Sequence, residues 1–133
     1  MTRQEVFNKV WEHAVTKNAP LCHEDGSSRC LYNGPNNNHC WIGAVLPEGQ
    51  FGIDSEELNT SGTVTDLMVE FAGINYMFEG ITVKFLLSLQ RCHDGLVSAK
   101  INKTHTKEGY AYTDKEYVLR DFARRFHVKV PVR

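Results

Sequence analysis

No apolar run in this 133-residue sequence approaches the length needed to cross a membrane. A spanning helix needs about 20 largely apolar residues, so a membrane protein is excluded. The opening residues, Met-Thr-Arg-Gln-Glu, lack the apolar core of a secretory signal, which predicts that the chain stays in the compartment where it is made. In a reducing cytosol the cysteines are expected as thiols or metal ligands; they are Cys22, Cys30, Cys40 and Cys92.

Several catalytic signatures are missing as well. The sequence contains no phosphate-binding Walker loop, no glycine-rich dinucleotide fingerprint and no carboxylate cluster beside a histidine for a two-metal nuclease. It also has no Cys-x-x-Cys pair, no internal repeat and no low-complexity tract. These absences favour binding without turnover as the function class.

Positive charge is absent from the middle of the chain. Between Arg29 and Lys84 there is no Lys or Arg, and residues 1–96 carry six of these against twelve Asp and Glu. Residues 97–133 carry nine against four, a balance of +5. A basic C-terminal third can present its charge to a phosphate-bearing ligand or an acidic partner. Alternatively, it packs beside the acidic middle and the two neutralise each other.

The composition, 41% hydrophobic and 23% charged, predicts one folded domain covering residues 1–133. Apolar residues at helical spacing indicate three main helices. The first starts at a capping box formed by Thr2, and the last starts at a capping box formed by Thr113. The middle one runs from Thr82 to a C-cap at Gly95 and is expected to be the central helix.

Glycine, proline and asparagine are concentrated between two short apolar runs, at Gly34-Pro-Asn-Asn-Asn38. These residues favour the dihedrals of a tight reversal, so the pattern predicts a β-hairpin over about residues 28–46. With a three-residue loop, Cys30 faces Cys40 across the ladder, and Tyr32 and Ile42 lie on that same face. The fold class expected is a mainly helical α+β domain with one hairpin.

The remaining segments give weaker patterns. A sixteen-residue connection without periodicity, such as residues 97–112, is usually functional or mobile. The other expectations are a short helix at residues 54–58, a helix opening at Thr63 or Thr65, an irregular segment at 73–80 and an edge strand at 128–133.

A cysteine-dependent hydrolase is one alternative to plain binding. Cys40-Trp41 is similar to the Cys-Trp pair of papain-like hydrolases. Those enzymes hold the cysteine at a helix N-terminus, which lowers its pKa, whereas the pattern here places it in a strand. Candidates for the base and its orienting partner are His93, His105, Asp94 and Asn102.

A zinc-stabilised interaction protein is the second alternative. Cys30 and Cys40 across the hairpin, joined by Cys22 or His23, offer ligands of the right type. Their spacing matches no zinc ribbon or finger, and cysteine is often buried simply as a small apolar residue. We therefore expect neither a metal nor another cofactor.

The candidate binding residues are the polar and aromatic groups that the expected fold does not need. They lie on the hairpin tip and on the basic loop and last helix. The set comprises Tyr32, Asn33, Asn36, Asn37, His39, Lys100, Lys103, His105, Arg124 and Arg125. The expected partner is a host protein or a phosphate-bearing small ligand. Tyr110 and Tyr112 could stack on bases, but a nucleic acid is not the expected partner.

Three pieces of sequence, in the same order, resemble a family of small uncharacterised proteins of tailed bacteriophages and prophages. They are the Thr2–Val10 helix, Cys30-x-Tyr-x-Gly-Pro … Cys40-x-Ile-Gly-x-x-x-Pro47, and Leu89-Gln-x-x-His-Asp94. The similarity covers most of residues 2–95, and the longer segment after Gly95 departs from it. That family has no established activity, so no catalytic residue can be transferred.

The resemblance implies a phage origin and a place in the cytoplasm of a bacterial host. We therefore expect a small accessory protein that acts by non-catalytic binding of a host factor or a nucleotide-like ligand. Antagonism of host defence is a role in keeping with that expectation. The sequence predicts no particular oligomeric state.

Overall fold

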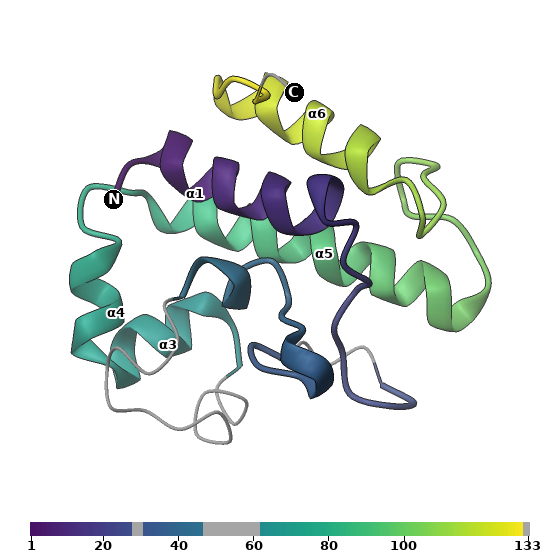
Figure 1. Ribbon diagram of the computed structural model, residues 1–133, viewed down its shortest axis with the longest axis horizontal. Coiled ribbons are helices and arrows are strands. Elements are labelled where there is room, and N and C mark those ends of the chain that lie inside the picture. Colours follow the sequence, from purple (N-terminus) through teal and green to yellow (C-terminus); the bar gives the residue numbers. More distant parts are fainter. Residues whose placement is uncertain (28–30, 47–61, 132–133) are drawn as a thin grey trace.

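The computed structural model describes residues 1–27, 31–46 and 62–131, and it is mainly helical, as expected (Figure 1). α5 is the longest helix and contacts both α6 and α3, while α1 packs against α6 (Figure 1). Within the described ranges, no helix combines the length and apolarity needed to span a membrane. The α-helices of these ranges are α1 (Arg3–Trp11), α3 (Val64–Glu70), α4 (Ala72–Met77), α5 (Val83–Asn102) and α6 (Lys115–Phe126).

The first helix begins where its capping box predicts. The Glu5 backbone N–H donates to Thr2 Oγ1 at 3.1 Å, and the Thr2 N–H donates to Glu5 Oε1 at 3.0 Å. α1 continues into a π-helical turn, Glu12–Thr16, and the chain turns away at Asn18, where φ is 50°. The expected apolar face is buried and comprises Val6, Phe7, Val10, Trp11 and Ala14.

Aromatic rings join the three longest helices. Phe7 of α1 stacks on Phe122 of α6, with ring centroids 6.1 Å apart. Phe85 of α5 meets Phe122 edge-on at 5.1 Å and Phe126 at 5.4 Å. Such contacts contribute about 0.5–1.5 kcal/mol each beyond the burial of area. This cluster fixes α1, α5 and α6 against one another.

The predicted end of the central helix at Gly95 is wrong. Thr82 caps α5 as expected, accepting a hydrogen bond from the Phe85 N–H at 3.3 Å. The helix then passes through Gly95 and ends at Lys103, which adopts the left-handed conformation with φ 54°. A single glycine in a helix costs about 1 kcal/mol, and the burial of Leu96 and Val97 just beyond it outweighs that cost. The first part of the expected 97–112 connection is therefore helical.

The described part of the predicted hairpin contains no strand. The chain does reverse, because the Gly34 N–H donates to the Asn38 carbonyl at 2.8 Å and the Cys40 N–H donates to the Leu31 carbonyl at 3.0 Å. Its arms are turns and short 3-10 helices at Pro35–Asn37 and Gly43–Val45. Cys40, Trp41 and Ile42 are consecutive and all buried, whereas a hairpin strand with one face exposed would bury only alternate residues. Residues 28–30, including Cys30, lie outside the described ranges, so the facing of Cys30 and Cys40 stays a prediction.

Shorter elements depart from expectation in smaller ways. Residues expected to be irregular form α4, while α3 begins at the expected Thr63, whose capping partner is Asp66. The residue at the N-cap position of α6 is Asp114 rather than the expected Thr113, and its side chain makes no capping hydrogen bond to the helix. Residues 128–131 form no strand; instead the Gln4 side chain hydrogen-bonds both the N–H and the carbonyl of Lys129. The helix expected at 54–58 lies outside the described residues.

Candidate functional site

Tyr32, one of the predicted binding residues, lies in the core with none of its side chain exposed. Its hydroxyl donates to the Gly62 carbonyl at 2.6 Å and accepts from Gln90 Nε2 at 2.7 Å. Gln90 Oε1 accepts from the Val64 N–H at 2.8 Å. One buried network thus ties the 31–46 segment to α3 and α5, and Tyr32 is placed away from any surface that a partner could reach.

The remaining residues of the predicted hairpin tip lie near a hollow beside the π-helical turn. Asn36 and His39 line it, together with His13. The His13 ring donates from Nε2 to the His39 carbonyl at 2.9 Å, and the His39 ring donates from Nδ1 to the Tyr32 carbonyl at 2.9 Å. Asn33 is half-buried and Asn37 belongs to the Pro35–Asn37 turn. The His13 imidazole therefore attaches the segment to the π-helical turn, and the His39 imidazole closes a bond within the segment.

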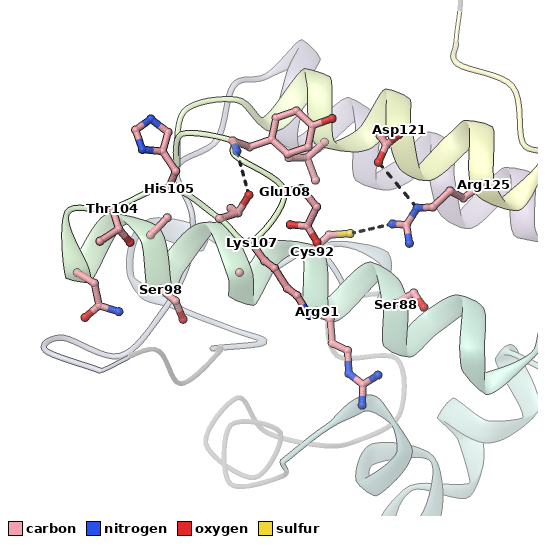
Figure 2. A pocket seen from close by; sticks show the side chains of 16 residues that line it. Ser88, Arg91, Cys92, Ser98, Thr104, His105, Lys107, Glu108, Asp121 and Arg125 are labelled. Atoms are coloured by element: carbon pink, nitrogen blue, oxygen red, sulfur yellow. Dashed lines mark hydrogen bonds and ion pairs between the residues drawn. The ribbon is translucent and has the colours of Figure 1, made fainter.

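The predicted basic residues divide between a second hollow and the open surface. His105 and Arg125 line this hollow, which lies between α5, α6 and the segment that connects them (Figure 2). Lys100 and Lys103 are exposed and lie outside its lining. Arg124 forms an ion pair with Asp121 one turn earlier on α6. The hairpin-tip group and the basic group therefore do not form one site.

Cys40 and His93 do not form a nucleophile and base. Cys40 is fully buried, and its Sγ accepts a hydrogen bond from the Gly43 N–H at 3.4 Å. His93 is 1% exposed and has both ring nitrogens engaged. Nε2 accepts from the Cys22 N–H at 3.2 Å, and Nδ1 donates to Asp94 at 3.1 Å. A nitrogen already occupied by a backbone amide is not poised to accept a proton from a thiol, so this geometry does not support the hydrolase alternative with His93 as its base.

The zinc alternative gains no support from the described residues either. Among them, no three His, Cys, Asp or Glu side chains are grouped so that they could hold a metal ion. Burial raises the pKa of the Cys22 thiol to about 11, and the nearby Cys40 contributes to the rise. A zinc ligand must be a thiolate, which such an environment disfavours. Cys30, one of the predicted ligands, lies outside the described ranges.

The hollow between α5 and α6, named here the α5–α6 cavity, has a volume of about 680 Å³. Three cationic side chains reach it from three elements: Arg91 from α5, Lys107 from the connecting segment and Arg125 from α6 (Figure 2). Glu108 and Asp121 add two carboxylates. The rest of the lining is small, polar or aromatic and comprises Ser88, Cys92, Gly95, Ser98, Ala99, Asn102, Thr104, His105, Thr106, Tyr110 and Val118.

A tight turn positions the part of this lining that comes from the connecting segment. The Thr106 N–H donates to the Tyr110 carbonyl at 2.8 Å, and the Tyr110 N–H donates back to Thr106 Oγ1 at 3.0 Å. Gly109 adopts φ 93°, a conformation that side-chain-bearing residues rarely take. Lys107 and Glu108 therefore lie at the tip of a closed turn beside α5.

Cys92 is the sulfur-bearing residue of the cavity lining. Arg125 Nη2 donates to its Sγ at 3.8 Å (Figure 2). Burial raises the pKa of the thiol to about 11, Arg125 opposes the rise, and Glu108 and Asp121 add to it. Cys92 is therefore a protonated thiol at neutral pH and a poor nucleophile.

Arg91 and Glu108 are the cavity residues of greatest chemical interest that sequence reasoning misses. Arg91 lies on the part of α5 that precedes Gly95, and Glu108 belongs to the cavity because α5 continues past Gly95 and the following turn folds back on it. A signal for the helical half was present: Ser88, Cys92, Gly95, Ser98 and Asn102 recur at helical spacing and form a small, polar stripe. The position of Glu108 depends on tertiary packing, for which the sequence has no comparable pattern.

No family model, curated protein or solved structure matches this chain. The resemblance to small phage proteins therefore stays a prediction, and the function has to be argued from the site itself.

Proposed function

We propose that this protein binds a small phosphate-bearing molecule in the α5–α6 cavity and does not turn it over. The observation that carries the proposal is that both Arg91 and Lys107 line this cavity. Within the part of the chain that the structure describes, neither cation forms an ion pair with another residue. Arg125 supplies a third cation, shared with Asp121 at 3.9 Å.

Cations that converge on a hollow from separate elements favour an anionic occupant. Guanidinium groups match phosphate oxygens with paired N–H donors, and lysine adds a mobile point charge. The hydroxyls of Ser88, Ser98 and Thr104 add neutral donors around the charged groups. Phosphate is the common biological anion with enough acceptor oxygens to use such a set.

The cavity volume suits a whole small molecule. Sites for such ligands commonly enclose about 300–1,000 Å³, and this one has about 680 Å³. Binding without turnover is favoured because the cavity thiol is held protonated by burial. In the bacterial host that the phage resemblance implies, a protein of this kind would act by capturing its ligand.

Binding is tested by NMR titration of the isotopically labelled protein with AMP, ribose-5-phosphate and inorganic phosphate. We expect shifts of backbone amides in residues 91–108 and around Arg125. The Arg91→Glu, Lys107→Glu double variant should weaken the tightest probe at least about tenfold, since two attractions become repulsions. The affinity should also fall as salt is added.

The matched control is the Lys9→Glu, Lys17→Glu double variant. It makes the same change in net charge, but at the hollow beside the π-helical turn. It should bind all three probes like the wild type. The proposal is overturned if no probe shifts the cavity amides, or if the control loses as much affinity as the cavity variant.

A further inference from the structure

The charged side chains that line the α5–α6 cavity are not all of one sign, and this limits what its ligand can be. Glu108 lies close enough to Cys92 to raise the pKa of its thiol, after burial as the main cause. Arg125 Nη2 lies 3.8 Å from the same sulfur. In Figure 2, Glu108 and Arg125 approach Cys92 from opposite sides. This end of the cavity therefore holds a carboxylate and a guanidinium together.

Glu108 differs from the other carboxylate in the cavity. Asp121 is engaged by Arg124 and Arg125 on its own helix. Glu108 forms no ion pair with any other residue in the described ranges. Its oxygens are therefore available to accept hydrogen bonds from a ligand, and a bare phosphate placed beside them would be repelled.

The ligand group that meets Glu108 has to be a neutral donor. An ammonium group would suit the carboxylate but would also meet Arg125, which is held at the same end of the cavity. Hydroxyl groups avoid this repulsion, and they can both donate to Glu108 and accept from neighbouring polar side chains. Ser98 and Asn102 line the cavity on α5 and provide such partners.

From this arrangement we infer that the cavity takes a sugar phosphate, free or as part of a nucleotide, with its hydroxyls on Glu108. The inference rests on the proposed function, because Arg91 and Lys107 hold the phosphate. In the view of Figure 2, the Lys107 side chain extends toward Arg91. Glu108 is then the residue that distinguishes a sugar phosphate from inorganic phosphate.

Calorimetric titrations with ribose-5-phosphate, inorganic phosphate and AMP test the inference. The wild type should bind ribose-5-phosphate at least about tenfold more tightly than inorganic phosphate, because each charge-assisted hydrogen bond is roughly twice as strong as a neutral one. Glu108→Gln should lower that preference about fivefold or more, since it weakens the sugar contacts and removes the repulsion of phosphate. AMP distinguishes a nucleotide from a free sugar phosphate as the ligand. Tighter binding of AMP than of ribose-5-phosphate indicates a nucleotide, and equal or weaker binding indicates a free sugar phosphate.

The control for Glu108→Gln is Glu79→Gln, an exposed carboxylate that follows α4. It removes the same charge and should leave the preference unchanged. If inorganic phosphate binds as tightly as ribose-5-phosphate, or if Glu108→Gln leaves the preference intact, the sugar inference is wrong while phosphate binding stands. If Arg91→Glu with Lys107→Glu does not weaken any probe, the proposed function itself fails.

Discussion

The hydroxyl of Tyr32 connects segments that are far apart in the sequence. It bonds to the Gly62 carbonyl and to the side-chain amide of Gln90, which is itself 3% exposed. A buried polar group that loses its partner keeps the full cost of its lost hydration, about 1–3 kcal/mol. The network therefore makes the Tyr32 hydroxyl one of the groups that hold the 31–46 segment in place.

Tyr32→Phe should lower the free energy of unfolding by about 1–3 kcal/mol, because Gln90 Nε2 and the Gly62 carbonyl lose a partner while the ring still fills its place. Urea unfolding followed by circular dichroism measures the change. Tyr117→Phe removes the same atom from a side chain that is 63% exposed and should change the stability little. Equal losses in the two variants would contradict the role of the network.

At the scale of elements, sequence reasoning succeeded where a local signal coincided with apolar periodicity. The capping box at Thr2, the helix start at Thr63 and the cap at Thr82 appear where they were predicted, whereas the capping box predicted at Thr113 does not form. The prediction failed at Gly95 because the apolar side chains just beyond it, Leu96 and Val97, are buried when the helix continues. In the hairpin the turn signal held and the strand prediction failed, because Cys40, Trp41 and Ile42 are all buried in the core and tertiary packing overrides strand propensity.

The continuation of α5 through Gly95 has a measurable consequence. A Cβ added at Gly95 meets nothing within 4 Å, so Gly95→Ala should stabilise the protein by about 1 kcal/mol through helix propensity. At Lys103, which adopts the left-handed conformation at the helix end, the stabilising substitution is the reverse one, to glycine. There the replacement by glycine relieves strain and should stabilise by about 0.5–1 kcal/mol.

Thermal and urea unfolding of both variants test this pair. Lys100→Gly, in the helical part of α5, is the matched control for Lys103→Gly and should destabilise by about 1 kcal/mol. If Gly95 were a C-cap, alanine would be forced into the left-handed region and would destabilise. A loss of stability in Gly95→Ala would therefore contradict the continuous helix.

At the scale of the whole molecule, the site was only partly predictable. The excess of positive charge in residues 97–133 pointed to the region that holds the α5–α6 cavity, and His105 and Arg125 were among the candidates. Arg91 enters the cavity from the half of the chain in which acidic residues are in excess. Net charge by segment does not show which charges meet, because that depends on how α5 and α6 pack.

Two histidines attach residues 19–27 and 31–46 to the helical elements, and the titration of one of them, His13, makes the fold sensitive to acid. The His13 ring donates to the His39 carbonyl, and the His93 ring accepts from the Cys22 N–H. Burial holds the pKa of His13 below its ordinary value of 6.5, and the hydrogen bond to the His39 carbonyl opposes this effect. Electrostatic interactions with the neighbouring His39, Lys17 and His93 also lower the pKa of His13.

The free energy of unfolding should therefore decrease as the pH falls below 6.5. Above that value His13 is neutral in both states and contributes no pH dependence. Below it the unfolded chain takes up the proton first, so stability is lost until the pH reaches the folded-state pKa. His13→Gln keeps an N–H donor for the His39 carbonyl but cannot be protonated. Urea unfolding from pH 7 to about pH 5 should show a shallower decline for this variant, and identical declines would show that His13 does not carry the effect.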